Sequence, residues 1–471
     1  MQIYDLPTHE TFSELSISNS GLGPIARYSP AKFAALTIDE LLLIPQSDYA
    51  GINVAHMAAL SQDKVHAIHI DWLSLNAIGG LTVDNIKGII DKRYFSEWIT
   101  DPAQITAISP KAFAALDIDQ LLAISKSNYR GITDEQIAAL PLDKVHAIHI
   151  DWLTASAIGG LTADNINGIT DLRYFNEWSF GPAQIAAIKP KAFAALDNER
   201  LWEISESNYK GITDEQIAAL PLDKVHTIHI NWLSESAIRG FTAANINGIV
   251  DRRYFSDWIT DPGQIAAINP RAFAALDIDQ LLAISRSNYR GISNEQIAAL
   301  PLDKVHAIHI NWLSESAIRG FTAANINGIV DRHYFSEWIT DPAQIAAIHP
   351  DAFAALTPTQ LSWFSALNSS AIAGISGAQL RNLSAQQAQA FLLESIVLIS
   401  PKALAAAGPG FTSNLSDEQI NKLTQDQINA VLPFLSPERF SQVLSVARVG
   451  QISEEVWAQV SREQMSALSP E

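Results

Sequence analysis

Four histidine pairs are the side chains of this sequence whose types and spacing are best suited to metal chemistry. The two histidines of each pair are three residues apart, which can place both imidazoles on one face of a helix. Asp71 and Asp151 follow the first two pairs and could complete a metal site, but Asn231 and Asn311 stand at the same places after the last two. We therefore predict no metal and no other cofactor.

The histidines have two further interpretations. They can lie at helix C-termini, where a protonated imidazole interacts favourably with the helix dipole, or they can act in a pH-sensitive contact. We retain the first histidine of each pair as a candidate binding residue: His66, His146, His226 and His306.

A second set combines tryptophan, tyrosine and arginine, which dominate the hot spots of protein interfaces. It consists of YFSEW-like strings, three of them preceded by arginine. The rings could instead wedge between helices as core, or stack on a polysaccharide. Because Tyr94 and Phe95 are adjacent, we expect one of them to face inward and the other outward. The candidate binding residues of this set are Trp98, Trp178, Trp258, Trp338, Tyr94, Tyr174, Tyr254, Tyr334, Arg93, Arg173 and Arg253.

Both sets recur because the chain repeats itself every 80 residues. The four repeats span 21–100, 101–180, 181–260 and 261–340, and a partial fifth spans 341–368. A fixed period of this kind is typical of stacked arrays, in which each repeat buries its apolar face against its neighbours. We predict a tandem-repeat body over 21–368, an N-terminal cap over 1–20, and a diverged helical continuation or cap over 369–471.

A shorter apolar pattern indicates helices. Apolar residues fall at positions 0, 5, 8, 13 and 16 of a 17-residue module, and a gap of three places two side chains on one helix face. Polar residues such as Thr133 with Gln136, and prolines such as Pro110, mark helix starts. We predict an all-α, superhelical solenoid of helices about two turns long, which tertiary stacking must hold. In the second repeat the pattern residues are Ile108, Phe113, Leu116, Leu121, Ile124, Ile132, Ile137, Leu140, Val145, Ile148, Leu153, Ile158, Leu161, Ile166 and Ile169.

The string SNYRG suits a helix-ending turn with a solvated tip. Its glycine recurs as Gly131, Gly211 and Gly291, and we expect it to adopt a positive φ.

Composition limits the partners. The 471-residue chain has 50 acidic and 31 basic side chains, a formal net charge of −19, so its field repels nucleic acid. It lacks cysteine and a long apolar run, and residues 1–16 do not resemble a secretory signal. We expect no membrane span, and either a cytoplasmic location or export by a bacterial route other than the general secretory one. The oligomeric state stays open.

Searches for the nucleotide-binding loop GxxxxGK[ST], for HExxH and for GxSxG find nothing in the sequence. We therefore expect a non-enzymatic repeat scaffold that binds a protein partner along an extended surface, in the setting of a bacterial secreted effector or toxin. Two alternatives remain: a ladder of aromatic residues that binds a polysaccharide, and an enzyme whose site is confined to the C-terminal region.

Overall fold

The computed structural model describes residues 25–176, 181–364, 366–444 and 449–468. These residues form many short helices and no β-strand, so the prediction of an all-α protein is confirmed. The predicted cap over 1–20 lies outside the described residues. The chain divides into two compact units, Met1–Leu220 and Pro221–Glu471, which we describe separately as the N-terminal and the C-terminal unit.

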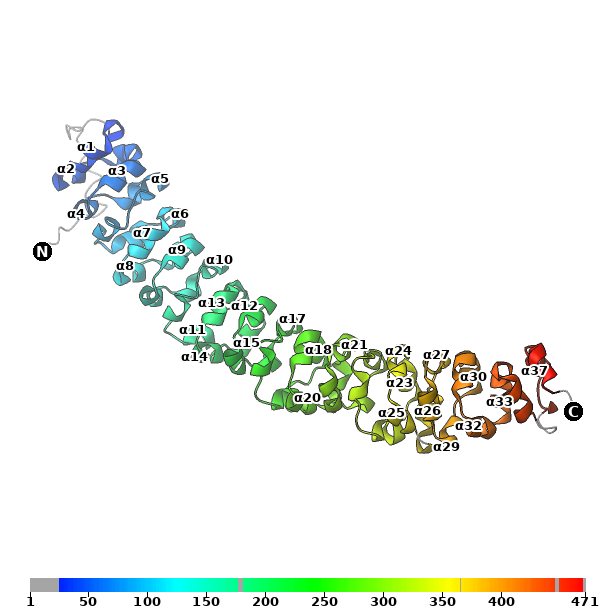
Figure 1. Ribbon diagram of the computed structural model, residues 1–471. Coiled ribbons are helices and arrows are strands. Elements are labelled where there is room, and N and C mark those ends of the chain that lie inside the picture. Colours follow the sequence, from blue (N-terminus) through cyan, green and yellow to red (C-terminus); the bar gives the residue numbers. More distant parts are fainter. Residues whose placement is uncertain (1–24, 177–180, 365, 445–448, 469–471) are drawn as a thin grey trace. The chain divides into compact units, whose positions relative to one another are not determined.

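The N-terminal unit alternates α-helices with 3₁₀ helices, labelled η (Figure 1). One η element, η5, is a π-helical turn. The elements of this unit are η1 Ile25–Arg27, α1 Pro30–Ala34, α2 Ile38–Leu42, η2 Gln46–Gly51, α3 Val54–Ala59, α4 Gln62–Val65, η3 Ile70–Trp72, α5 Leu75–Ile78, η4 Ile86–Gly88, η5 Tyr94–Trp98, α6 Pro102–Ala107, α7 Pro110–Ala115, α8 Ile118–Leu122, η6 Lys126–Gly131, α9 Asp134–Ala139, η7 Leu142–Ala147, η8 Ile150–Trp152, α10 Ala155–Ile158, η9 Ile166–Gly168, α11 Arg173–Asn176, α12 Pro182–Ala187, α13 Pro190–Ala195, α14 Asn198–Trp202, α15 Glu206–Tyr209 and α16 Asp214–Ala219.

The C-terminal unit is built in the same way, with π-helical turns at η13 and η18. Its elements are η10 Leu222–Thr227, η11 Ile230–Trp232, α17 Glu235–Ile238, η12 Ile246–Gly248, η13 Tyr254–Trp258, α18 Pro262–Ala267, α19 Pro270–Ala275, α20 Ile278–Ala283, η14 Arg286–Gly291, α21 Asn294–Ala299, η15 Leu302–Ala307, η16 Ile310–Trp312, α22 Glu315–Ile318, η17 Ile326–Gly328, η18 Tyr334–Trp338, α23 Pro342–Ala347, α24 Pro350–Ala354, α25 Pro358–Ser362, η19 Ala366–Asn368, α26 Ser369–Ala373, α27 Gly377–Arg381, α28 Ala385–Gln389, α29 Leu393–Ile396, α30 Pro401–Ala407, α31 Pro409–Asn414, α32 Asp417–Lys422, α33 Gln425–Val431, η20 Leu432–Phe434, α34 Pro437–Val443, α36 Glu454–Trp457 and α37 Arg462–Ser466.

Local signals set where these helices begin. Ser109 caps α7 by accepting a hydrogen bond from the amide of Ala112, and Pro110 occupies the first helical position. Thr133 and Gln136 form the predicted capping box at the start of α9. The α-helices are only four to seven residues long, so most of their backbone groups lie in a first or last turn and need partners outside the helix.

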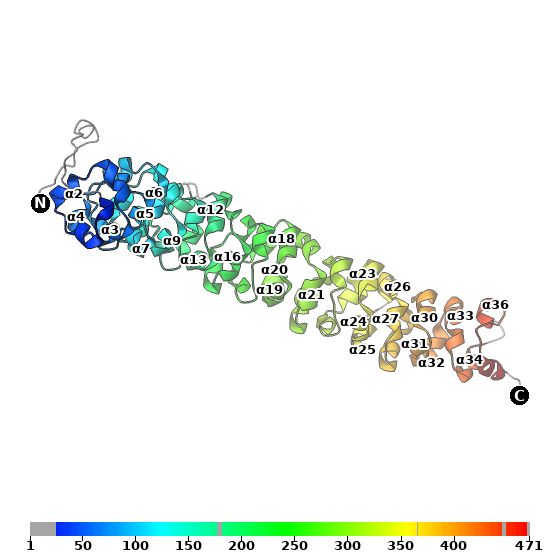
Figure 2. The same ribbon diagram turned by 90° about the horizontal axis from the view of Figure 1, so that it is seen from above.

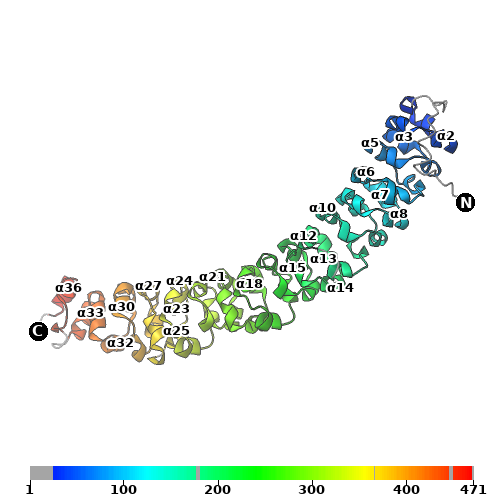
Figure 3. The same cartoon turned by 180° about the vertical axis from the view of Figure 1, so that it is seen from behind.

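Each short helix packs against the third element after it. In the N-terminal unit, α6 contacts η6, α7 contacts α9 and α8 contacts η7; in the C-terminal unit, α18 contacts η14, α19 contacts α21 and α20 contacts η15. Equivalent helices of successive sequence repeats lie along the same edge of each unit, as α8 and α14 do in one and α20 and α25 in the other (Figures 1 and 3). Figure 2 shows the succession of short helices in each unit from above.

Buried glutamines join these layers. The side-chain oxygen of Gln136 accepts from the amide of Thr133, while Nε2 donates to the carbonyl oxygens of Ile105 and Ile108 at 2.8 and 2.7 Å. One side chain thus caps the start of α9 and satisfies carbonyls at the end of α6. Glutamines that donate to carbonyls of an earlier helix in the same way are Gln120, Gln216, Gln280, Gln296, Gln360, Gln379, Gln419, Gln427 and Gln464.

The apolar pattern identifies the core. All fifteen pattern residues of the second repeat are buried, none more than 4% exposed. The pattern also holds at Leu415, Ile420 and Leu423. It fails at Met465, which is 48% exposed because no described element follows α37 to cover it.

The glycines of the SNYRG string are needed for a different reason from the one predicted. In the described residues Gly408 alone has a positive φ, so the prediction for Gly131, Gly211 and Gly291 is wrong. Gly131 instead ends the 3₁₀ helix η6, where a Cβ atom would lie 1.9 Å from the carbonyl oxygen of Pro102. Close packing on α6 therefore requires glycine, and the string is solvated at Ser127 and Arg130 while Asn128 and Tyr129 are buried.

None of the helices in the described parts of the chain combines the length and the apolar character needed to cross a bilayer.

Candidate functional site

An aspartate, a cation and a tryptophan gather at each described YFSEW-like string. In the first repeat, Nε of Arg93 donates to both carboxylate oxygens of Asp91 at 3.0 Å, and the guanidinium lies 4.7 Å from the centre of the Trp98 ring. The carboxylate holds the guanidinium against the indole, and such a cation–π contact stabilises the arrangement further. Trp98 remains half-buried. We call this group and its equivalents the Asp–cation–Trp clusters.

The C-terminal unit has two such clusters. Arg253 is held by Asp251 and lies 4.6 Å from the ring of Trp258, which is 37% exposed. In the other, His333 replaces arginine: its Nδ1 lies 2.6 Å from Asp331, and its ring stacks on Trp338 at 5.4 Å. Trp338 is 40% exposed.

The second repeat is described only in part. Arg173 pairs with Asp171 at 2.7 Å, but Trp178 lies outside the described residues.

The cations keep the aspartates of the clusters charged. Burial raises the pKa of Asp91, but hydrogen bonds from the guanidinium and backbone of Arg93 lower it more, so this pKa lies below its ordinary value. For Asp171 and Asp251 the hydrogen bond from the arginine side chain is the main cause of a lowered pKa. Because the folded-state pKa of Asp91 is depressed, its ion pair stabilises the fold above the ordinary aspartate range, and this contribution is lost as the pH falls through the depressed pKa.

The tyrosines of the strings belong to the core. Tyr94 is 1% exposed, and its hydroxyl donates to the carbonyl oxygen of Ile68 at 3.1 Å. Phe95 is equally buried, so the expectation that one of the two neighbours faces outward is wrong. The pair begins a π-helical turn, which is closed by a hydrogen bond from the amide of Ile99 to the carbonyl of Tyr94. Tyr174, Tyr254 and Tyr334 are buried as well.

The two histidines of each pair have different surroundings. His66 is the C-cap of α4 and half-buried, and its equivalents His146, His226 and His306 are exposed near the ends of 3₁₀ helices. The second histidine begins the next 3₁₀ helix and packs on a tryptophan, as His69 does on Trp72 with ring centres 4.0 Å apart. The pair therefore does not share one helix face, because the first helix ends between its members.

Burial changes the protonation of the second histidine in two of the pairs, and the described parts of the chain contain no group of side chains suited to a metal ion. Burial lowers the pKa of His229 and of His309, which favours the neutral imidazole. Within residues 25–176, 181–364, 366–444 and 449–468, no three side chains of the metal-binding types are close enough together to hold an ion.

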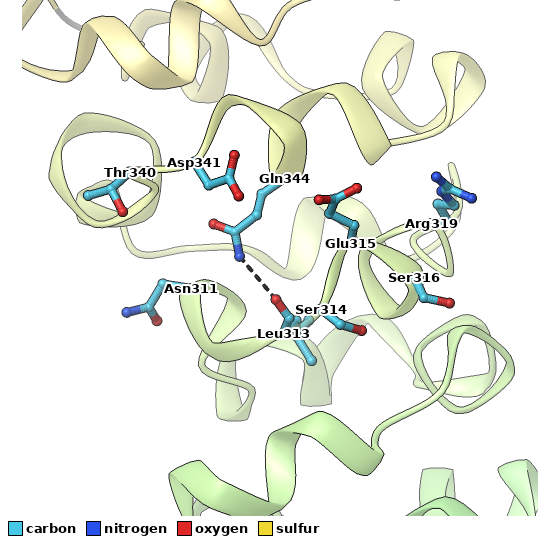
Figure 4. Close-up of a pocket in the computed structure, with 9 residues that line it drawn as sticks. All are labelled: Asn311, Leu313, Ser314, Glu315, Ser316, Arg319, Thr340, Asp341 and Gln344. Atoms are coloured by element: carbon cyan, nitrogen blue, oxygen red, sulfur yellow. Dashed lines mark hydrogen bonds between the residues drawn. The ribbon is translucent and has the colours of Figure 1, made fainter.

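A polar groove lies next to the last cluster in the C-terminal unit (Figure 4). Its volume is about 690 Å³, and η16, α22 and the start of α23 form its walls. Nε2 of Gln344 donates to the carbonyl oxygen of Leu313 at 3.0 Å and ties two walls together. Asp341 caps α23 by accepting from the amide of Ala343. The residues that line the groove are Asn311, Leu313, Ser314, Glu315, Ser316, Arg319, Thr340, Asp341 and Gln344.

A second depression of about 370 Å³ shares Glu315 and Arg319 with this groove. Its other side is apolar, with Ala343, Ala346 and Ile348 among the lining residues. Glu315 and Arg319 therefore stand between a polar and a more apolar hollow, both within residues 311–350.

Sequence reasoning missed this groove. Its charged residues belong to no known motif, but a comparison of the repeats contains a signal. Glu315 and Arg319 stand where the first repeat has Leu75 and Gly79, so the fourth repeat carries two extra charges on one helix.

No protein-family model and no curated protein matches this chain.

Proposed function

We propose that the protein is a non-enzymatic scaffold, folded as a superhelical solenoid, that binds a protein partner along an extended surface. The observation that carries the proposal is the recurrence of half-exposed tryptophans, each held against a cation, at the equivalent positions Trp98, Trp258 and Trp338 of three repeats. Arginine and tryptophan in fixed geometry are typical anchors of protein interfaces, since little side-chain entropy remains to be lost on binding.

The surroundings of the tryptophans favour a protein partner over a polysaccharide. A sugar ring stacks on a free indole face, but Arg93 lies over the Trp98 ring and Arg253 over the Trp258 ring. His309 likewise stacks on Trp312. An arginine fixed in this way presents a planar, charged group of the kind that recurs in protein interfaces.

The proposal retains the setting of a bacterial secreted effector or toxin, and it leaves the partner unidentified. The alternative of an enzyme places the active site within residues 369–471. Both hollows described above are instead lined by residues between 311 and 350.

Replacing the arginines of two Asp–cation–Trp clusters tests the proposal. The immobilised full chain captures proteins from a lysate, and the affinity of each captured protein is then measured for the double variant Arg93→Gln, Arg253→Gln. We expect the Kd to rise about tenfold or more, as for hot-spot residues, with unchanged far-ultraviolet circular dichroism.

Trp202→Ala is the control, because Trp202 is 54% exposed on α14 but belongs to no Asp–cation–Trp cluster. Its affinity should stay within about twofold of the original. Capture of no protein, or a captured protein that binds the arginine variant unchanged, would contradict the proposal. A glycan-array signal that the same variant abolishes would favour the polysaccharide ladder.

A further inference from the structure

The residues that line the groove of the fourth repeat recur in the third repeat of the same unit, where the Glu235 carboxylate lies against Gly263 at the place that Ala343 takes in the fourth repeat. Each of the groove's nine lining residues has an identical residue 80 positions earlier. The supporting hydrogen bonds recur too: Gln264 donates to the carbonyl of Leu233 at 3.2 Å, and Asp261 caps α18 by accepting from Gly263 at 2.9 Å. The copied residues are Asn231, Leu233, Ser234, Glu235, Ser236, Arg239, Thr260, Asp261 and Gln264.

The first two repeats differ at the charged positions without a structural reason. Gly79 and Arg319 both close their short helices in the right-handed helical region, with φ of −60° and −58°. A Cβ atom at Gly79 would lie 3.3 Å from the carbonyl oxygen of Asn76, a tight contact, but Arg319 shows that the equivalent position accepts a side chain with the same backbone conformation. The arginine of the third and fourth repeats therefore changes the surface and not the fold.

The charges of the groove are available to a ligand. Glu315, Arg319 and Asp341 are exposed, and in the described residues none of them has an ion-pair partner within 4 Å. Figure 4 shows Gln344 between Asp341 and Glu315, and Arg319 beyond Glu315. A basic group fits either carboxylate and an acidic group fits the guanidinium, so the complementary ligand carries both charges a short distance apart.

The spacing of the two sets of residues fits an extended peptide. α17 packs on α18, α18 on η14 and η14 on η16, and the element after η16 is α22, the equivalent of α17, so slightly more than three packed layers separate equivalent positions. Packed helices lie about 8–10 Å apart, which places the two sets roughly 24–30 Å apart. An extended chain rises about 3.3 Å per residue and covers that distance in about eight residues.

We propose that the third and fourth repeats form a tandem site for an extended polypeptide segment in which a basic residue closely followed by an acidic one occurs twice, about eight residues apart. This inference rests on the proposed function and specifies the class of partner. Two weak contacts on one chain then act together, because binding of the first raises the local concentration of the second.

The test uses fluorescein-labelled peptides and the full chain, with fluorescence anisotropy as the measurement. One peptide carries two Lys-Gly-Gly-Glu blocks whose lysines are about eight residues apart. A peptide of equal length carries one block, with Gly and Ser in place of the other. We expect the two-block peptide to bind about tenfold more tightly, and the advantage to shrink as salt rises.

The variant Arg239→Gly, Arg319→Gly gives both helices the residue found at Gly79 and should lose much of the advantage of the two-block peptide, because the peptide's glutamates lose their partners while its lysines keep theirs. Arg332→Ala, an exposed arginine of the same unit outside the groove, is the control and should keep the difference. The inference is overturned if wild type binds neither peptide, if it binds both equally, or if the Arg239→Gly, Arg319→Gly variant keeps the advantage. The scaffold proposal would survive that result if a captured protein still depended on Arg93 and Arg253; it would fail separately if those arginines had no effect.

Discussion

Two neighbouring glycines show how closely single residues are fitted in this protein. A Cβ atom at Gly80 would lie 2.3 Å from the carbonyl oxygen of Val54 and 2.8 Å from Cβ of Met57, whereas at Gly79 the nearest atom would be 3.3 Å away. The four repeats agree with this difference: the position of Gly80 is glycine in all four, whereas the position of Gly79 is arginine in two.

We predict that Gly80→Ala lowers the free energy of unfolding by about 2 kcal/mol or more, because α3 must move away from the new methyl group. Gly79→Ala is the matched control and should change it by less than about 0.5 kcal/mol. Urea unfolding followed by circular dichroism measures both. Equal effects of the two substitutions would show that the close approach of α3 does not limit stability.

Other residue-scale expectations depended on assuming regular helix geometry. The sequence identified Tyr94 and Trp98 as partners in one string, and their rings do meet, edge to face, at 4.6 Å. It did not reveal that the tyrosine is buried while the tryptophan stays half-exposed, since burial depends on which neighbouring layers pack on each ring.

The elements are held by contacts between layers more than by their own hydrogen bonds. A helix of six residues such as α9 leaves most of its carbonyls without a partner inside the helix. Gln136, Asn165 and Lys144 supply donors across layers, as Nδ2 of Asn165 does to Ile137 and Leu140 and Nζ of Lys144 to Ala114 and Leu116.

Gln136→Ala should lower the free energy of unfolding by about 1–3 kcal/mol, because the carbonyl of Ile108 loses its donor, the carbonyl of Ile105 keeps only the amide of Ile108, and the start of α9 loses one capping hydrogen bond. Gln136→Glu separates the two roles of the side chain. It keeps an acceptor for the amide of Thr133 but turns a carboxylate toward two carbonyl oxygens, so we expect at least as large a loss.

Glu135→Ala, at an exposed position of the same helix, serves as the reference and should have an effect within about 0.5 kcal/mol. Midpoints of urea unfolding compare the three variants. A Gln136→Glu protein as stable as the original would mean that capping alone, and not the link between layers, explains the buried glutamines.

For the whole molecule, a deletion preserves the packing partners of the remaining elements when it removes one whole repeat. One 80-residue repeat, such as 261–340, contains ten elements from α18 to η18. Removing all ten joins Thr260 to Asp341, so that α17, η12 and η13 meet α23, α24 and α25, the equivalents of their present partners α18, α19 and α20.

We therefore predict that deletion of 261–340 leaves a folded protein with unchanged helicity per residue and one intact groove, formed by 231–260 with Asp341 and Gln344. The two-block peptide should lose its advantage for this protein. Circular dichroism, thermal unfolding and anisotropy provide the measurements.

Deletion of 261–300 is the contrasting case. It removes five elements and sets α17 against η15, so we expect lower helicity and loss of cooperative unfolding. The packing scheme would be wrong if both deletions folded equally well.

The sequence by itself determined the helical class, the 80-residue period, the core positions and many helix starts, because apolar spacing and capping residues act within a few residues of one another. Only the tertiary structure decided which glycines are needed for close contact, which rings remain exposed and where charges line a groove. These properties depend on residues about 25 to 33 positions apart that packing brings together, and no local pattern records them.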